Sequence, residues 1–195
     1  MNTVIIDYGA GNTKSVQFAL KRLGVEAILT NKEELIRKAD KVIFPGVGHA
    51  NSAMKKLAEV ELDKVIPDLK QPVLGICLGM QLMCKFSEEG NTNGLGIFDL
   101  NVIKFSDNNK IPQIGWNNIF HLKTNLFDNL NEKEFMYFVH SYYVPFAQET
   151  IAKANYGLEY SAALQKNNFY GCQFHPEKSG DKGELILKNF LKLKQ

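Results

Sequence analysis

The first half of the chain alternates short apolar runs with amphipathic stretches. The apolar runs predict β-strands at residues 3–9, 25–30, 41–46 and 72–76. Between them apolar residues recur at helical spacing, as Val16, Ala19 and Leu20 do before Gly24, a typical helix stop. Helices are predicted at 15–24 and 33–39, within 49–69, and in the run 82–86. This alternation of strands and helices predicts a mostly parallel α/β sheet.

The pattern changes after about residue 95. Strand-like runs separated by turn residues occupy 95–106, 111–122, 135–146, 151–157 and 168–176. We expect these strands to extend the same sheet, with some antiparallel pairs, and an amphipathic helix to close the chain at 184–194. No linker, repeat or low-complexity tract interrupts the sequence. We therefore expect one domain over residues 1–195, an open, mostly parallel mixed sheet flanked by helices.

The composition is that of an ordinary soluble globular protein, with 195 residues of which 45% are hydrophobic. The 23 Lys and Arg nearly balance the 21 Asp and Glu, which gives no reason to expect nucleic acid or anionic lipid as a partner. No apolar run approaches the roughly 20 residues that span a bilayer. The first residues lack the pattern of a secretory leader, so a cytoplasmic protein is expected. The three cysteines lack C-x-x-C spacing, which argues against a disulfide framework and a structural zinc site.

Candidate chemistry begins at Gly75-Ile76-Cys77-Leu78-Gly79, between an apolar strand and an apolar helix. The G-x-C-x-G spacing is the sulfur version of the nucleophile elbow, a sharp strand-to-helix turn that exposes a reactive side chain. The start of a helix also favours a thiolate. From this motif alone a second interpretation stays open, in which Cys77 is a small residue packed in a glycine-bearing turn. Cys84 has no flanking glycines, and Cys172 lies in a predicted strand whose alternate residues include Phe174, so packing is the favoured interpretation for both.

A thiol nucleophile needs a base, and His175 in Gln173-Phe174-His175-Pro176-Glu177 is the best candidate. If His175 and Glu177 continue a strand-like path, they project to the same side, where the carboxylate can orient the imidazole. His140, at the end of an aromatic strand, is either a core histidine or a pocket residue. His121 is expected at an ordinary turn or surface position.

The segment Pro45-Gly46-Val47-Gly48 follows the third predicted strand directly. Paired glycines let backbone N–H groups approach a substrate and form an oxyanion hole, although the same dipeptides are common in plain turns. Combined with the elbow and the His-Pro-Glu motif, this segment supplies the third part that acyl transfer requires.

These motifs resemble the class I, triad-type glutamine amidotransferases, through GICLGMQ at 75–81 and QFHPEKSG at 173–180. DYGAGN at 7–12, PGVGHA at 45–50, PQIGWN at 112–117 and YFVHSYYV at 137–144 are similar to one branch, the glutaminase subunits of imidazole glycerol phosphate synthases. The resemblance covers nearly the whole chain. It implies the family's flavodoxin-like core and hydrolysis of glutamine to glutamate and ammonia through a cysteine thioester, with no metal or cofactor.

The resemblance also implies roles for individual residues. Cys77 corresponds to the nucleophile, His175 to the general base and acid, and Glu177 to the orienting carboxylate. The other implied positions are the oxyanion strand and its second donor (Gly46, Val47, Gly48, Leu78), the glutamine-holding residues (Gln81, Glu89), the opposite wall of the pocket (His140, Ser141, Tyr142) and the partner-facing residues (Asn12, Lys178).

The partner implied by the resemblance is a (β/α)8-barrel cyclase in a one-to-one heterodimer. That chain would use the ammonia to make imidazole glycerol phosphate and an aminoimidazole carboxamide ribotide in histidine biosynthesis. Alternatives are a paralogous glutaminase that feeds a different barrel-type synthase, a cysteine hydrolase or peptidase of similar architecture, and a catalytically dead docking subunit. The Gln81 and His-Pro-Glu context argues against the hydrolase, and the full set of Cys77, His175 and Glu177 argues against the dead subunit.

Overall fold

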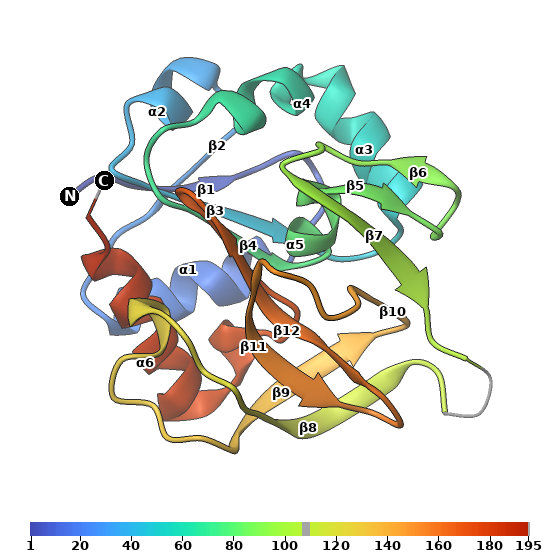
Figure 1. Ribbon diagram of the computed structural model, residues 1–195. Helices are drawn as coiled ribbons and strands as arrows, with labels where there is room; N and C mark the ends of the chain where they lie inside the picture. Colours follow the sequence, from blue (N-terminus) through green and yellow to red (C-terminus); the bar gives the residue numbers. More distant parts are fainter. Residues whose placement is uncertain (107–109, 195) are drawn as a thin grey trace.

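The computed structural model describes residues 1–106 and 110–194 (Figure 1). Within them, a seven-stranded sheet has the order β11-β12-β13-β4-β3-β1-β2. Its parallel strands are β1 (Thr3–Ile6), β2 (Ile28–Thr30), β3 (Lys41–Gly46), β4 (Val73–Cys77) and β13 (Phe169–Cys172); β12 (Glu159–Lys166) and β11 (Thr150–Asn155) continue it antiparallel. The predicted open, mostly parallel mixed sheet is confirmed.

Helices cover both faces of this sheet (Figure 1). α1 (Thr13–Arg22) and α6 (Gly180–Lys192) lie on one face; α2 (Glu33–Arg37), α3 (Ala50–Glu59), α4 (Leu62–Val65), η1 (Ile66–Asp68) and α5 (Leu78–Met83) lie on the other. Alternate strand residues divide between two cores, with Ile5 and Ile43 facing α1 and α6. Val4 and Val42 face the opposite helices, as the two-residue period of a strand requires.

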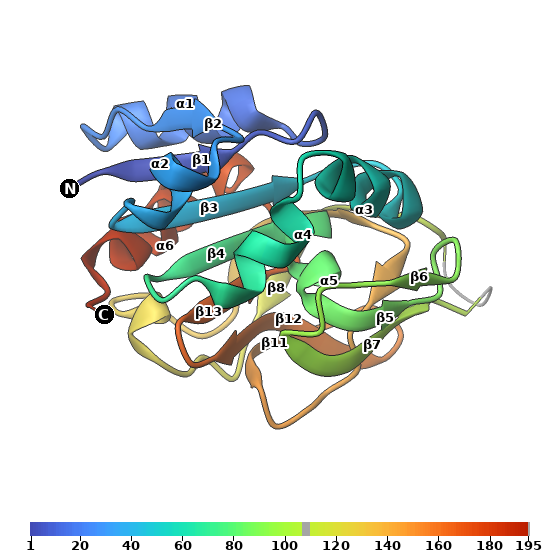
Figure 2. The ribbon, with the colours of Figure 1, turned by 90° about the horizontal axis from the view of Figure 1, so that it is seen from above.

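Several strands of the second half do not join the main sheet, so that part of the prediction was wrong. A separate sheet is formed by β5 (Cys84–Ser87), β6 (Thr92–Asn93) and β7 (Phe98–Lys104), seen in Figure 2, together with β10 (Tyr142–Tyr143). A hairpin is formed by β8 (Gln113–Ile119) and β9 (Glu134–His140), which lie side by side in Figure 1. The hairpin buries Ile119, Met136 and Phe138 against the core of the main sheet. It thus packs on the face of the sheet, and directly after β8 an isolated antiparallel bridge joins Phe120 to Lys153 of the edge strand β11.

Two predicted elements also differ in extent, and one strand was not anticipated. The helix expected through 82–86 is confirmed at Leu82 and Met83 and wrong from Cys84 on, because Cys84 is extended and pairs with Phe98 in β7. The strand expected at 25–30 is limited to β2, and β12 was not anticipated. Two short 3₁₀ turns, η2 (Asn125–Phe127) and η3 (Pro176–Lys178), complete the fold. Within the described residues, none of the helices combines the length and apolar character that crossing a bilayer requires.

The first turn of α5 lies directly against the backbones of β3 and β4. A Cβ atom added to Gly79 would overlap the carbonyl oxygen of Phe44, and one added to Gly46 would lie 2.6 Å from the Gly79 nitrogen. Gly75 has no more room, since its Cβ would lie 2.8 Å from the Met80 nitrogen. The glycines of the G-x-C-x-G motif are therefore needed for helix-to-strand contact as well as for the turn.

We expect Gly79→Ala to lower the free energy of unfolding by about 3 kcal/mol or more, because the methyl group must push α5 off β3. Urea unfolding followed by circular dichroism measures the change. Ser52→Ala, at an exposed position of α3, is the control and should stay within about 0.5 kcal/mol of wild type. A Gly79→Ala protein as stable as the control would show that the helix can shift at no cost.

Candidate active site

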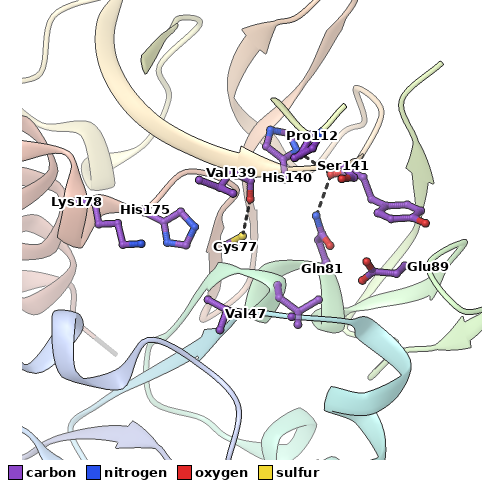
Figure 3. A pocket seen from close by; sticks show the side chains of 13 residues that line it. Val47, Cys77, Gln81, Glu89, Pro112, Val139, His140, Ser141, His175 and Lys178 are labelled. Carbon is purple, nitrogen blue, oxygen red and sulfur yellow. Dashed lines mark hydrogen bonds between the residues drawn. The ribbon is translucent and has the colours of Figure 1, made fainter. Parts of the chain in front are cut away.

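Cys77 lies where β4 ends and α5 begins. Its backbone has φ 53° and ψ −110°, a strained conformation for a residue with a Cβ atom. The strand-turn-helix geometry is the nucleophile elbow that the sequence predicts. The side chain lines a cavity of about 300 Å³ at the carboxyl end of the parallel strands (Figure 3), the edge where open α/β sheets bind ligands.

His175 and Glu177 meet beside this cavity, although not along the expected strand-like path. β13 ends at Cys172, and Pro176–Lys178 forms the 3₁₀ turn η3. The turn brings His175 Nδ1 to 2.8 Å from Glu177 Oε1, with both side chains buried. Because Nδ1 donates to the carboxylate, the other ring nitrogen, Nε2, is left to interact with Cys77 (Figure 3).

The surroundings of His175 favour its charged form. Burial by itself lowers the pKa of the imidazole, but hydrogen bonding and charge from Cys77 and Glu177 outweigh that effect and raise it to about 10. His175 is thus protonated at neutral pH beside the sulfur of Cys77. A thiolate paired with an imidazolium is an arrangement that activates a cysteine for nucleophilic attack.

Backbone contacts hold His175 in place. Its N–H donates to Tyr137 O at 2.9 Å, and its carbonyl oxygen accepts from Ser179 Oγ at 2.6 Å. Ser179 Oγ in turn accepts from Tyr137 N at 3.0 Å. The loop after β13 is therefore tied to β9, and the imidazole cannot move far from the cavity.

The segment after β3 forms one wall of the cavity. Val47 and Gly48 line it, whereas Gly46 is buried in β3 and pairs with Cys77. Leu78, the first residue of α5, also lines the cavity, at a position where helical N–H groups have no partner within the helix. Val47, Gly48 and Leu78 therefore share a cavity with Cys77, and their N–H groups stay the predicted donors for a developing oxyanion.

Tyr8 supports this wall from behind and was not anticipated as a site residue. Its hydroxyl donates to Pro45 O at 3.1 Å, and its ring packs on Phe44 with 5.5 Å between centroids. Burial raises the pKa of Tyr8, and the charge of Cys77 raises it further, so the hydroxyl keeps its proton as a donor. The motif DYGAGN contains this residue, but the sequence gives no sign that Tyr8 reaches Pro45.

Gln81, Glu89 and Ser141 line the cavity on the side away from His175 and Lys178 (Figure 3), and Tyr142 lines it as well. Gln81 Nε2 donates to Tyr142 O at 2.9 Å, which joins α5 to β10. Glu89 Oε2 accepts from Ala50 N at 2.8 Å, so this carboxylate caps the start of α3. Both side chains have fixed positions from which they can hold a polar substrate.

His140 is a buried member of the cavity lining. Burial lowers its pKa to about 4; the bond to Tyr142 O raises the pKa and the charge of His175 lowers it again. The neutral ring donates from Nδ1 to Tyr142 O at 2.8 Å, and Nε2 lies 3.3 Å from the Tyr160 hydroxyl. His140 is therefore both the core histidine and the pocket residue that the sequence left as alternatives.

The two predicted partner-facing residues differ in position. Lys178 lines the cavity mouth, with its ammonium 6.0 Å from the centre of the Tyr137 ring. Asn12 precedes α1 as its N-cap residue and does not line the cavity. α1 packs beside η3, the turn that carries Lys178.

Sequence reasoning missed Pro112, Val139 and Gln173. Pro112 and Val139 line the cavity, and Gln173 contacts the Cys77 sulfur from within the core. Gln173 precedes His175 by two residues, which was the available signal. Cys84 and Cys172 are fully buried, and burial raises the pKa of both thiols, so they are poor nucleophiles.

Metal ligation is not supported by the part of the chain that the structure describes, where no group of three or more His, Cys, Asp or Glu side chains could hold an ion. The groups that line the site near Cys77 are its sulfur, the imidazole of His175 and backbone N–H groups.

Comparison with protein-family models gives a match to "Glutamine amidotransferase class-I" over residues 4–193. The chain is 57% identical to "Imidazole glycerol phosphate synthase subunit HisH" of Bacteroides fragilis strain YCH46, over 99% of this chain and 100% of that protein. It is 49% identical to the protein of the same name from Haemophilus influenzae strain Rd, over 98% and 97%.

Solved structures show the same fold. A structure described as a glutamine amidotransferase matches with a TM-score of 0.74 and 19% identity, over 97% of both chains. The structure of PurLQS from Thermotoga maritima matches with a TM-score of 0.72 and 15% identity, also over 97% of both chains.

The neutral state of His140 predicts a pH dependence of stability. Its folded pKa of about 4 lies below the ordinary 6.5, so the unfolded chain binds a proton first and stability falls as the pH drops from about 6.5 toward 4. Between pH 7 and pH 5 the free energy of unfolding, measured with urea, should fall by about 2 kcal/mol less in His140→Gln than in the wild type. His121→Gln, at an exposed turn, is the control and should keep the wild-type slope. Equal slopes for all three proteins would mean that His140 is protonated in the folded state.

Proposed function

This chain belongs to the class-I glutamine amidotransferase family, and we propose that it is the glutaminase subunit of an imidazole glycerol phosphate synthase. It hydrolyses glutamine and passes the ammonia to a partner subunit in histidine biosynthesis. The observation that carries the proposal is Cys77 on its left-handed turn beside the His175–Glu177 pair, in a chain 57% identical over its length to a HisH subunit. The match over residues 4–193 supports a single amidotransferase domain over 1–195. The proposal also has the protein act in the cytoplasm.

The proposed reaction begins with attack of the Cys77 thiolate on the side-chain amide carbon of glutamine. Negative charge moves onto the amide oxygen, where N–H groups of Val47, Gly48 and Leu78 stabilise it. His175, protonated because of its raised pKa, gives its proton to the amide nitrogen, and the C–N bond breaks to release ammonia. A γ-glutamyl thioester remains on Cys77.

Neutral His175 then accepts a proton from water, and the hydroxide adds to the thioester carbonyl. The C–S bond breaks, glutamate leaves, and the thiolate and imidazolium are restored. Glu177 stabilises the charge on His175 each time it forms. Gln81, Glu89, Ser141 and Tyr142, with His140 behind them, hold the glutamine in the cavity. No metal or cofactor takes part.

The partner is a (β/α)8-barrel cyclase in a one-to-one heterodimer. Free ammonia is mostly protonated and lost at neutral pH, so direct transfer is needed. The outer face of the β8–β9 hairpin supports a docking surface, since Ile114, Trp116 and Phe135 are each more than half exposed. Val139, on the same hairpin face, lines the cavity, so a partner docked here covers its mouth, where Lys178 also lies. Asn12, at the start of α1, is the second partner-facing residue of this proposal.

A paralogous glutaminase that feeds another barrel-type synthase and acceptor is the alternative function. Acceptor chemistry belongs to the partner, so glutamine hydrolysis measured with and without the cyclase and its nucleotide substrate separates the two. Stimulation by the cyclase supports the histidine pathway, and its absence supports the alternative.

We expect Cys77→Ala to abolish glutamine-dependent activity of the complex while leaving activity with added ammonium salt. The loss should be at least about 10⁴-fold, since the nucleophile itself is removed. Coupled measurement of glutamate and of cyclase product gives both rates. Cys84→Ala, a buried thiol remote from the cavity, is the matched control and should stay within a few fold of wild type. A Cys77→Ala protein that still hydrolyses glutamine rules out the proposed mechanism.

We expect Trp116→Ala to weaken binding of the cyclase by about 30-fold, the loss typical of a buried aromatic anchor. Isothermal titration calorimetry measures the dissociation constant. Leu35→Ala, an exposed apolar residue on α2 at the far end of the molecule, is the control and should leave affinity unchanged (Figure 1). Equal affinities of the two variants for the cyclase would show that the docking surface does not include the hairpin.

A further inference from the structure

Gln173 lies in the core directly beside Cys77, although it lies outside the cavity lining. Its side chain is fully buried, and its Nε2 is 3.7 Å from the Cys77 sulfur, within hydrogen-bond distance for a sulfur acceptor. Its Oε1 accepts from Gln81 Nε2 at 2.8 Å. A buried amide with both ends engaged is held in one orientation.

That orientation is set by a backbone carbonyl. Tyr142 O can only accept, so the group of Gln81 that lies 2.9 Å from it must be the NH₂. The same NH₂ gives its second hydrogen to Gln173, which must therefore present its oxygen to Gln81. Nothing but the NH₂ of Gln173 is then left to face the sulfur. The carbonyl oxygen of Tyr142 thus fixes the donor and the acceptor in each of the three hydrogen bonds that link Tyr142, Gln81, Gln173 and Cys77.

We propose that Gln173 is a hydrogen-bond donor to the sulfur of Cys77 and stabilises its thiolate during the reaction. This inference deepens the proposed function and rests on it for its catalytic meaning. In the neutral thiol, the S–H proton is donated to Val139 O at 3.7 Å (Figure 3). In the thiolate that proton is gone, and the amide N–H of Gln173 remains directed at the negative sulfur from the side opposite the solvent.

The donor matters most when the thioester breaks down. Water gives a proton to His175, its hydroxide adds to the thioester carbonyl, and the C–S bond breaks with its electron pair returning to sulfur. The Gln173 N–H meets this returning charge, and Gln173 itself loses no proton. A donor that strengthens as charge develops lowers the barrier for the leaving thiolate.

Other ionisable groups also face Cys77, so the experiment must isolate the amide. They are His175 and Glu177 from the loop after β13 and η3, Tyr8 from the loop after β1, His140 from β9, Glu89 from the β5–β6 turn and Lys178 at the mouth. The substitution Gln173→Met changes none of these groups. It removes the uncharged amide donor of Gln173 and leaves the net charge of the protein the same.

The test is the pH profile of alkylation by iodoacetamide, from about pH 5 to about pH 10, the range in which perturbed thiols titrate. Cys84 and Cys172 are fully buried, so the reaction in the folded protein reports Cys77. We expect Gln173→Met to move the midpoint of the profile upward by about one pH unit, the effect of losing one hydrogen bond to a charged group. The alkylation rate below the wild-type midpoint then falls about tenfold.

Two further proteins keep the result interpretable. Gln173→Asn keeps a buried amide but withdraws it from the sulfur, and it should give the same upward movement if the Met variant does not fold. Gln71→Leu removes another buried glutamine, which donates to Ile36 O at 2.7 Å outside the cavity lining. It should lose thermal stability with an unchanged profile.

An unchanged profile in both Gln173 variants, with a loss of stability like that of Gln71→Leu, would overturn the proposal and leave Gln173 a packing residue. Alkylation needs no glutamine, so this result is separate from the proposed function. A wild-type protein that fails to hydrolyse glutamine with its partner would overturn the function, while the profile would still test the hydrogen bond.

Discussion

The contact between the first turn of α5 and the backbones of β3 and β4 is the constraint on which the site depends. Gly46, Gly75 and Gly79 let the helix approach until side-chain atoms have no room between the two backbones. At this distance Cys77 must turn from strand to helix within one residue, which forces its φ to 53°. The same contact sets the sulfur beside the segment that follows β3. One close contact between α5 and the strands thus determines the helix packing, the strain at Cys77 and the position of the proposed nucleophile.

Much of this could be predicted because the signals are local. A short apolar run followed by G-x-C-x-G specifies a strand, a turn and a helix from neighbouring residues. The alternating pattern of the first half likewise fixes parallel strands, since both faces of β1, β3 and β4 are buried. The proximity of His175 and Glu177 was expected, but the path was wrong: Pro176 begins a 3₁₀ turn in which residues two apart meet on its inner side.

What could not be predicted depends on residues far apart in the sequence. Cys84 continues a helical pattern, yet it is extended because β7, which begins at Phe98, offers backbone partners. Tertiary pairing overrides local propensity at that point. Tyr8 reaches Pro45 and Gln173 reaches Gln81 across even longer separations, and neither pair has a sequence signature. Supports of a catalytic group are harder to read from sequence than the group itself.

The two imidazoles of the site show why such supports decide the chemistry. His140 is enclosed by the rings of Phe105, Phe138 and Tyr160, and burial holds its pKa at about 4. His175 is also buried, but Glu177 and Cys77 reverse the effect and raise its pKa to about 10. At neutral pH the proton that the proposed acyl transfer needs therefore resides on His175, next to the sulfur. A neutral His140 does not compete for that proton, so in the proposed mechanism His175 alone is the acid that protonates the leaving amine.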